Sequence, residues 1–353
     1  MNDRVSRKPA TIKTVASDLG LSIATVSRAL KGDDLVTEET RARVNESATR
    51  LGYRRDFRGV NLRTGRTYTL CALLTTVPTV EFADPATTHL IQGLVAGTAA
   101  SDFKVVVLPT DSGENQLAML DELVANGRFD GFILDATEPL DARIRLLLER
   151  GARFVSFGRT ELLSEHPYFD IDNEDAAYRA TMQLAKAGHT RIALIDAPNR
   201  YLFSRQRLRG YRRALIDAGI AFDQAYVSEM DIGIRSVHER VSEFLKLDAS
   251  PTGFVTSNEV AMLGTLRACR DLPEAVFRSL GFVSRDGSQL FDYIQPAVSS
   301  LYYPLFDAGK HLTEMLVEVI RGAPVASLQK VERAELIIRS DAPKPDQDRS
   351  TGT

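Results

Sequence analysis

The sequence predicts an all-α helix-turn-helix head followed by an α/β core of two doubly wound parallel-sheet lobes. Three observations favour this organisation. Short capped helical patterns open the chain, an arginine-rich segment follows them, and from residue 68 short apolar runs alternate with amphipathic stretches. With 353 residues, of which 44% are hydrophobic, the chain is long enough for two or three compact units.

The first two helices of the head are short and separated by a turn. Thr11 is placed to cap the first helix, and Gly20 supplies the turn after it. Ser22 is placed to cap the second helix, in which Val26 and Leu30 fall four residues apart on one apolar face. This arrangement is typical of a helix-turn-helix, in which the second helix reads DNA.

A third helix completes the head. Thr37 is expected to cap it, Val44, Ala48 and Leu51 form its inward stripe, and Gly52 ends it. Residues 1–66 carry 14 lysine and arginine residues against 8 aspartate and glutamate residues, a net charge of +6, whereas the whole chain has a net charge of −3. A basic head on an acidic body indicates that the head meets phosphate.

The second helix is the expected recognition helix. Side chains at its N-terminal end reach deepest into the major groove, where Ile23 and Ala24 can offer only apolar contact, for instance to a thymine methyl group. Arg28, one turn later, can hold guanine O6 and N7 with two hydrogen bonds. The hydroxyls of Thr25, Ser27 and Tyr53 suit phosphate. The alternative interpretation is a small helical bundle with a solvated arginine face.

Residues 53–66 form an expected hinge segment. Leu62 is an isolated apolar residue among five arginines, a mixture used by minor-groove binders that wedge an apolar side chain between base steps. Gly59 costs a helix about 1 kcal/mol relative to alanine, so the segment is expected to become helical only on DNA. The predicted DNA-binding residues are Ser22, Ile23, Ala24, Thr25, Ser27, Arg28, Tyr53, Arg58, Gly59 and Leu62.

The core is expected to contain two lobes because its strand-like runs are too many for one sheet. These runs show little alternation, as expected for parallel strands buried on both faces, and ligands of such folds bind at the carboxyl ends of the strands, here between the lobes. The expected domains are a head at 1–52, a hinge at 53–66, an N-lobe at about 67–167 and 298–323, a C-lobe at about 168–297 and 324–342, and a flexible tail at 343–353.

Other classes of protein find little support in the sequence. No phosphate-binding loop, zinc-protease motif or nucleophile elbow is present, so we expect no enzyme, no catalytic residue, no metal and no cofactor. Cys71 and Cys269 are far apart in apolar segments and are expected to be buried and unpaired. No apolar run is long enough to span a membrane and no secretory leader opens the chain, which predicts a cytoplasmic protein.

Taken together, these segments resemble the lactose-repressor/galactose-repressor family of bacterial transcription regulators. Ala-Thr-Val-Ser-Arg-Ala-Leu at 24–30 is similar to the family's recognition helix, and Leu-Arg-Thr-Gly-Arg-Thr at 62–67 to the end of its hinge. The resemblance covers nearly the whole chain, because further signatures follow in the family's order. They lie at 51–53, 172–173, 188–193, 207–211, 257–259 and 335–339.

The resemblance implies a homodimer that binds a pseudo-palindromic operator, with Leu62 wedged into the minor groove. It also implies that a small molecule between the lobes changes the affinity for double-stranded DNA. Arg207 and Glu259, which follows Asn258, match positions that bind this effector, and a cationic fork and a carboxylate can both pair with hydroxyls. Three further candidates follow the ends of predicted strands, and Phe82, in the loop after the first strand, has a ring that can stack on a sugar. The full set of predicted effector-binding residues is Arg207, Glu259, Asn258, Asp135, Arg159, Asp286 and Phe82.

The stretch at 158–168 is similar to a branch of the family associated with α-glucoside regulation, so we expect a repressor of carbohydrate uptake or catabolism genes. Some positions depart from the family: Arg55 and Asp56 replace a usual proline and asparagine, Gly59 replaces a common hinge alanine, and Met262 replaces an alanine. Two other functions remain open. One is a sugar-binding receptor without a regulatory role, and the other is a regulator of a non-sugar ligand such as a nucleobase.

Overall fold

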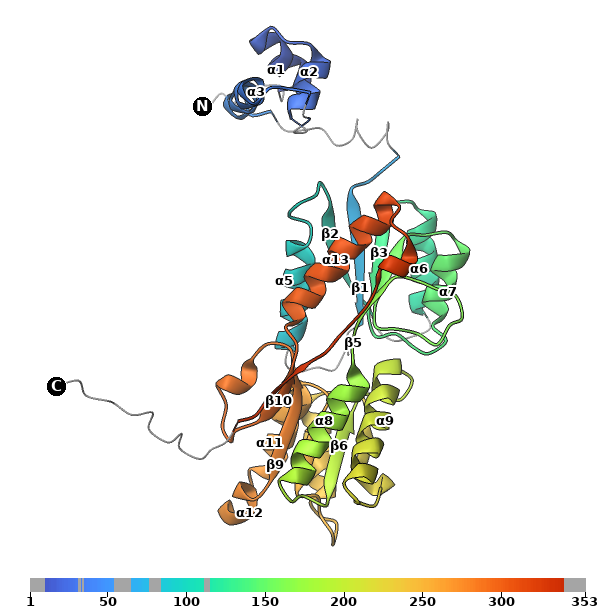
Figure 1. The fold of residues 1–353 in the computed structure, drawn as a ribbon, viewed down its shortest axis with the longest axis vertical. Coiled ribbons are helices and arrows are strands. Elements are labelled where there is room, and N and C mark those ends of the chain that lie inside the picture. The colour runs from blue at the N-terminus through green and yellow to red at the C-terminus, as the bar shows by residue number, and fades with distance from the viewer. Residues whose placement is uncertain are drawn as a thin grey trace, which may run out of the picture. The chain divides into compact units, whose positions relative to one another are not determined.

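The computed structural model describes residues 10–30, 33, 35–53, 65–75, 84–110 and 115–339. They form two compact units, which divide between Thr67 and Tyr68. The first unit is the predicted three-helix head, and the second contains two sheets with their helices (Figure 1).

The head consists of α1 (Ile12–Leu19), α2 (Ile23–Ala29) and α3 (Glu38–Arg50). Each helix begins where the sequence predicts, because the hydroxyls of Thr11, Ser22 and Thr37 each accept a hydrogen bond from the backbone N–H three residues later. Gly20 ends α1 in the left-handed conformation, with φ at +64°. The predicted head is therefore confirmed in its helices and in their caps.

One small apolar core holds the three head helices together. Val15, Val26 and Val44 come from α1, α2 and α3 respectively, and none of the three is exposed to solvent. The buried residues of each helix lie on one face, so the opposite face of each helix is exposed to solvent.

The first lobe is built on a six-stranded parallel sheet with the strand order β11-β5-β4-β3-β1-β2. Alternate residues of β1 point to opposite faces. Leu70, Ala72 and Leu74 pack with α5 and α13, whereas Cys71 and Leu73 pack with α6 and α7. The elements of this lobe are β1 (Thr69–Thr75), α5 (Pro85–Ala96), β2 (Lys104–Thr110), α6 (Asn115–Ala125), β3 (Gly131–Leu134), α7 (Ala142–Glu149), β4 (Phe154–Phe157), β5 (Tyr168–Ile171), α13 (Leu305–Arg321), the short helix η3 (Val325–Ser327) and β11 (Gln329–Glu332).

The second lobe has the strand order β12-β10-β9-β8-β6-β7, in which only β12 runs antiparallel to its neighbour. Helices α8 and α9 pack on one face, and α10 and α11 pack on the other. Both lobes thus have the predicted doubly wound form. The elements are α8 (Asn173–Lys186), β6 (Ile192–Asp196), α9 (Leu202–Asp217), η1 (Gln224–Tyr226), β7 (Val227–Glu229), α10 (Ile234–Phe244), β8 (Gly253–Thr256), α11 (Glu259–Cys269), α12 (Glu274–Arg278), β9 (Gly281–Asp286), η2 (Leu290–Asp292), β10 (Ser299–Tyr302) and β12 (Glu335–Ile337).

The chain crosses between the lobes three times, and each crossing lies later than the sequence predicts. β5 belongs to the first sheet, so the first crossing follows Ile171 rather than residue 167. β10 belongs to the second sheet and β11 to the first, which corrects the expected crossings near 298 and 323 to the segments after Tyr302 and after Glu332. The residues of a short strand do not show which of the two sheets the strand joins, because that depends on the strand with which it pairs.

Helix α13 returns the chain from the second lobe to the first, where it lies beside α5 (Figure 1). The two helices approach so closely that each needs a glycine at the contact. A Cβ atom on Gly93 would lie 1.9 Å from the Phe306 carbonyl oxygen, and one on Gly309 would lie 2.2 Å from the Leu90 carbonyl oxygen. With 17 residues α13 is the longest described helix, and none of the described helices is both long and apolar enough to cross a membrane.

Both cysteines lie in the core. Cys71 in β1 and Cys269 at the end of α11 are buried and unpaired, as predicted. Burial raises the pKa of each thiol to about 12, so both are protonated at neutral pH.

The α5–α13 contact predicts that Gly93→Ala destabilises the core. In an open helix this substitution is favourable by about 1 kcal/mol, but overpacking against a backbone carbonyl costs about 1–3 kcal/mol or more. We expect a lower urea midpoint of unfolding for the second unit. Gln92→Ala, at an exposed position of the same helix, serves as the control and should leave the midpoint unchanged. An unchanged midpoint in Gly93→Ala would contradict the close approach of the two helices.

Candidate functional site

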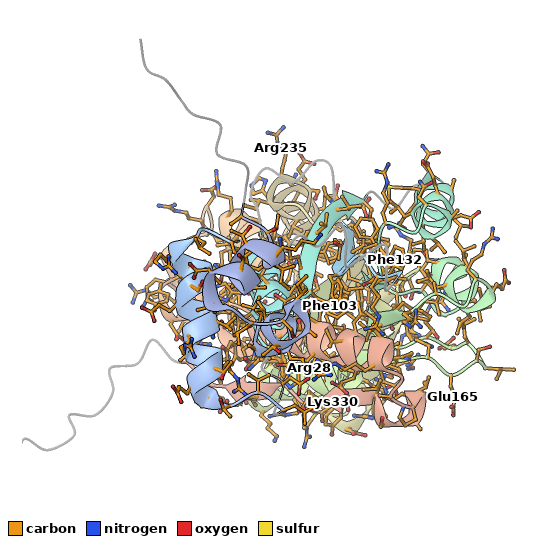
Figure 2. All side chains as sticks on the ribbon, turned by 90° about the horizontal axis from the view of Figure 1, so that it is seen from above. Arg28, Phe103, Phe132, Glu165, Arg235 and Lys330 are labelled. Carbon is orange, nitrogen blue, oxygen red and sulfur yellow. The ribbon has the colours of Figure 1, made fainter. Side chains whose placement is uncertain are left out.

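The outward face of α2 carries the residues predicted to contact DNA. Ser22 accepts a hydrogen bond from the Thr25 backbone N–H at 3.0 Å, and its hydroxyl lies 2.8 Å from that of Thr25. Val26 and Ala29 are buried in the head core, so the remaining residues are turned outward. Ser22, Ile23, Ala24 and Arg28 are exposed, with Arg28 labelled in Figure 2, while Thr25 and Ser27 are partly buried.

Ile23 is 45% exposed although it is a large apolar residue at the first position of α2. Nothing in the packing of the head requires an isoleucine there, because the head core is filled from the opposite face. An exposed apolar side chain at the start of α2 and an exposed arginine one turn after Ala24 give the helix both apolar and polar groups, which suit the mixed edge of a base pair in the major groove.

The position of α2 is fixed by the other two head helices. The Asp18 carboxylate at the end of α1 accepts hydrogen bonds from the Ser47 hydroxyl and the Arg50 guanidinium of α3. The Ser47 hydrogen bond, with Arg50 beside it, lowers the pKa of Asp18. α1 and α3 are therefore linked by polar contacts at their surface as well as by the apolar core.

Tyr53 is the first predicted hinge residue and is partly buried, with its backbone N–H bonded to the Ala48 carbonyl at 2.9 Å. Arg58, Gly59 and Leu62 lie outside the described residues, and so does Phe82 among the predicted effector-binding residues. Their proposed roles stay predictions.

Arg207 lies in the second lobe, on α9, and is one of the most strongly bonded side chains of the core. Its Nε donates to Asp196 Oδ2 at 2.8 Å and its Nη2 to Asp196 Oδ1 at 2.5 Å, which is a bidentate pair at the end of β6. Its Nη1 donates to Asn173 Oδ1 at 3.1 Å, and the Phe203 ring lies 4.6 Å from the guanidinium carbon. Only 6% of Arg207 is exposed, so it is not a surface charge.

Arg159 lies in the first lobe and is connected to Arg207 through a chain of polar contacts. Arg159 Nε donates to Asp170 Oδ2 at 2.7 Å, and Asn173 Nδ2 lies 3.4 Å from Asp170 Oδ1. Asn173 then accepts the hydrogen bond from Arg207. Asp170 belongs to β5 of the first sheet and Asn173 is the first residue of α8 in the second lobe, so this polar chain crosses from one lobe to the other.

Glu259 is the first residue of α11 and is 1% exposed. Its Oε1 accepts from the Gly287 backbone N–H at 2.8 Å and from the Ser288 hydroxyl at 3.0 Å. Burial, together with the negative charge of Asp84, raises the pKa of Glu259. Asn258 caps α11, because its Oδ1 accepts from the Ala261 backbone N–H at 2.9 Å.

The carboxylate of Asp286 is bonded largely within its own turn. Its Oδ1 accepts from the backbone N–H groups of Ser288 and Gln289 at 3.1 and 2.8 Å, and its Oδ2 lies 3.4 Å from the Ser300 hydroxyl and 3.8 Å from Arg339. These contacts make Asp286 the residue that shapes the loop after β9. The predicted contact with an effector would have to share oxygens that are already bonded.

Asp135 links the ends of two neighbouring strands of the first sheet. It follows β3, and its Oδ1 accepts from the backbone N–H of Thr75, the last residue of β1, at 2.8 Å. Burial raises the pKa of Asp135 to about 6, with the Thr75 hydrogen bond and the charge of Arg143 acting against this. The carboxyl end of the first sheet thus holds a buried acid whose pKa lies above its usual range.

Three residues that the sequence reasoning missed complete the charged region between the lobes: Asp170, which pairs with Arg159, and two others, Asp84 and Arg285. Asp84 caps α5 in the first lobe by accepting from the Ala86 backbone N–H at 3.0 Å. Arg285 is the penultimate residue of β9 in the second lobe. Burial and the positive charge of Arg207 lower the pKa of its guanidinium, while acids of both lobes act against this. We call this set the interlobe charge cluster: Asp84 and Asp170 of the first lobe, and Arg207, Glu259 and Arg285 of the second.

Direct contacts confirm that the lobes meet around this cluster. The Leu202 backbone N–H at the start of α9 donates to the Thr137 carbonyl of the first lobe at 2.9 Å. On the Glu259 side, a Cβ atom on Gly287 would lie 3.1 Å from the Ala86 Cβ of α5. Gly287 is the residue whose N–H binds Glu259, so the glycine lets the second lobe approach α5 at this point.

Two of the missed residues, Asp196 and Arg285, follow the same rule that selected the predicted ones. The effector contacts predicted from strand ends are Asp135, Arg159 and Asp286. Asp196 and Arg285 also lie at the ends of strands. The signal for these two was present in the sequence. Asp84 has no such signal, because its place opposite Glu259 depends on the packing of one lobe against the other.

A groove of about 370 Å³ lies close to the polar chain but outside the interlobe charge cluster. Its charged groups largely neutralise one another, since Arg209 and Arg213 both pair with Glu174 at 3.2 and 3.0 Å. It therefore offers few free partners to a ligand. The lining residues are Arg159, Asp172, Glu174, Asp175, Gln206, Arg209 and Arg213.

Each of the two units matches a known protein family. A family model described as bacterial regulatory proteins, lacI family, matches residues 11–56, and one described as a periplasmic binding protein-like domain matches residues 181–340. The first covers the head helices, and the second covers most of the second lobe together with α13, β11 and β12.

Relatives match along nearly the whole chain. The HTH-type transcriptional regulator AglR of Rhizobium meliloti (strain 1021) is 31% identical over 345 residues, which cover 96% of each chain. The HTH-type transcriptional repressor CytR of Escherichia coli (strain K12) is 28% identical over 340 residues, covering 96% of this chain and 98% of the relative.

A solved structure described as a transcriptional regulator CelR–cellobiose complex superposes with a TM-score of 0.70 and 26% sequence identity, covering 94% of this chain and 99% of the other. The regulatory protein of the LacI family from Chloroflexus aggregans shares the fold, with a TM-score of 0.68, 24% identity, and coverage of 78% of this chain and 98% of the other. With a helix-turn-helix head, a two-lobed core and relatives matched from end to end, this chain belongs to the LacI family of DNA-binding transcriptional regulators.

Proposed function

We propose that this protein is a ligand-responsive repressor of carbohydrate uptake or catabolism genes that binds a pseudo-palindromic operator as a homodimer. The observation that carries the proposal is the outward face of α2, on which Ser22, Ile23, Ala24 and Arg28 are exposed without any role in the head core. A second unit with charged groups buried between its lobes supplies a place for the ligand.

On the operator, α2 would lie in the major groove with its N-terminus toward the bases. Ile23 and Ala24 then provide apolar contacts, and Arg28 donates two hydrogen bonds to a guanine. Thr25, Ser27 and Tyr53 contact phosphate, while Arg58, Gly59 and Leu62 form the minor-groove contact of the hinge segment.

The effector is proposed to bind at the interlobe charge cluster, with Arg207 and Glu259 as its first two contacts. Arg207 has one N–H on Nη1 and one on Nη2 that make no hydrogen bond to a described residue, and these are available to hydroxyl groups. The structure of the similar regulator CelR is titled as a complex with cellobiose, which supports a saccharide as the effector here. The α-glucosides are the first saccharides to test.

The polar chain from Arg159 through Asp170 and Asn173 to Arg207 gives the effector a way to change the lobes. A ligand shifts a conformational equilibrium only through contacts that differ between the two states. A ligand that binds Arg207 acts on a residue that is connected through Asn173 to Asp170 of the first lobe. Binding there favours one arrangement of the lobes, and the arrangement of the lobes sets the affinity for the operator.

The first lobe offers an apolar surface for a homodimer. Val95 of α5, Val106 of the edge strand β2 and Phe306 of α13 are 55%, 38% and 38% exposed. The three elements are neighbours, because α5 packs against both β2 and α13. Exposed apolar residues grouped at a sheet edge are typical of an interface between chains.

Replacing Arg28 with alanine is expected to weaken specific operator binding by about 1–3 kcal/mol and to relax the base preference at one position. The measurement is binding to a randomised oligonucleotide pool followed by titration of the selected site. Arg43→Ala, at an exposed position of α3, removes the same charge elsewhere in the head and should leave the base preference intact. An unchanged preference in Arg28→Ala would rule out this residue as a base-reading contact.

Arg207→Lys is expected to abolish the response to the effector while operator binding persists. Lysine keeps the positive charge beside Asp196 but lacks the planar fork that binds Asp196 and Asn173 together. Saccharides are first screened for a thermal shift of the wild-type protein, and the ligand found is then tested for its effect on operator affinity. Arg205→Lys, on the same helix but exposed, is the control. A normal response in Arg207→Lys would contradict the proposed contact.

The double substitution Val95→Glu and Val106→Glu is expected to convert the homodimer into a monomer, because two carboxylates would be buried in an apolar interface without partners. Sedimentation equilibrium measures the change. Ile216→Glu changes an apolar residue of α9 that is 74% exposed and should leave the dimer intact. A dimer that survives the double substitution would place the interface elsewhere.

A further inference from the structure

Tyr68 has a backbone conformation that is unusual for its residue type. Its φ is +52°, in the left-handed region, which a residue with a Cβ atom adopts only at a cost in free energy. A conformation of this kind persists only where the surrounding structure holds it. Tyr68 is also the first residue of the second unit, since the boundary between the units falls between Thr67 and Tyr68. The strained residue therefore stands where the chain enters the core.

Both backbone polar groups of Tyr68 are held by neighbouring segments. Its N–H donates to Asp130 Oδ2 at 2.9 Å, and its carbonyl accepts from the Lys104 backbone N–H at 3.0 Å. The centroid of its ring lies 5.5 Å from that of Phe103. Phe103 and Lys104 lie at the start of β2, and Asp130 directly precedes β3. The two strands that flank β1 in the sheet therefore both contribute to the conformation of Tyr68.

Asp130 is the anchor of Tyr68 that depends on the identity of a side chain in a hydrogen bond. The backbone N–H of Asp130 donates to the Thr69 carbonyl at 2.8 Å, and that of Lys104 donates to Tyr68. Any residue except proline can make these two backbone bonds. The bond to the Tyr68 N–H, in contrast, needs a side-chain acceptor at position 130.

The opposite end of β1 is tied to β3 in the same way. The Thr75 backbone N–H at the end of β1 donates to Asp135 Oδ1 at 2.8 Å. Asp130 and Asp135 directly precede and follow β3, so the two acids that bracket one strand bind the N–H groups at both ends of its neighbour. A shift of β1 along β3 would break both bonds. The entry to the core is thereby fixed relative to the carboxyl end of the first sheet.

We propose that Asp130 is a positioning residue for operator binding, because by holding the Tyr68 N–H it limits the directions that the chain before Tyr68 can take. This inference rests on the proposed function, in which two heads bind the two halves of one operator. A head whose chain can take fewer directions loses less freedom when it binds. Specific binding needs both heads at a set spacing, whereas non-specific binding depends on phosphate contacts that one head can make alone.

The test compares Asp130→Ala with Asp130→Asn in the full-length protein. Alanine removes the acceptor for the Tyr68 N–H, whereas the side-chain oxygen of asparagine keeps an acceptor without the negative charge. Each variant is titrated with the operator that the wild type selects from a randomised oligonucleotide pool, and with an unrelated duplex of the same length.

We expect Asp130→Ala to raise the Kd for the operator about 10- to 100-fold, of the order expected when one further backbone residue per chain is ordered on binding. The Kd for the unrelated duplex should not change, and Asp130→Asn should bind the operator nearly as well as the wild type. Glu149→Ala, which removes a carboxylate from an exposed position of α7 in the same lobe, is the matched control and should bind both duplexes like the wild type.

The hydrogen bond itself is measured by hydrogen exchange of the Tyr68 amide in the absence of DNA. This amide should exchange faster in Asp130→Ala than in the wild type and should remain slow in Asp130→Asn. Unchanged exchange in Asp130→Ala would show that the carboxylate does not hold the Tyr68 N–H and would overturn the proposal, whatever the affinity of the variant for DNA.

The outcomes with DNA separate this inference from the proposed function. If Asp130→Ala binds the operator like the wild type, the role of Asp130 is rejected while the proposed function stands. Equal losses of affinity for the operator and the unrelated duplex would show that Asp130 only maintains the fold. Equal losses in Asp130→Ala and Asp130→Asn would show that the charge acts rather than the hydrogen bond, and either result rejects the inference. If the wild type itself selects no operator, the proposed function is rejected and this inference with it.

Discussion

The bidentate pair between Arg207 and Asp196 is the interaction on which the arrangement of the core depends. A buried ion pair is tolerated only when the hydrogen-bonding groups of both partners are satisfied, and removal of one partner leaves an uncompensated charge in the interior. Here the pair joins α9 to the end of β6, and Asn173 extends it to Asp170 and Arg159 of the other lobe. Two lobes that fold around separate sheets are thereby tied by one continuous set of polar contacts.

The same pairing leaves part of the Arg207 guanidinium unused. Among the described residues Asp196 and Asn173 accept three of its five N–H groups, so one N–H on Nη1 and one on Nη2 remain without an acceptor. The Asp196 carboxylate, by contrast, is engaged through both of its oxygens. The ion pair therefore holds Arg207 in a fixed orientation while two of its donors remain available.

In the head, stability and recognition use different faces of the same helix. Val26 and Ala29 hold α2 against α1 and α3, whereas Ile23, Ala24 and Arg28 are exposed. The exposed residues can therefore change with the operator sequence without loss of the fold. The separation of head and core into two compact units means that each has its own apolar core.

The sequence by itself determined the local structure of this protein. Caps at Thr11, Ser22 and Thr37, buried apolar runs and helical periodicity are short-range signals, so the helix-turn-helix and the two doubly wound lobes could be predicted. The roles of Arg207 and Glu259, which come from resemblance, stay predictions. Only the tertiary structure decided which lobe takes β5, β10 and β11, and that Asn173 connects Arg207 to Asp170 of the other lobe. Strand pairing and the meeting of charges from distant segments depend on packing between elements, which no local pattern of residues encodes.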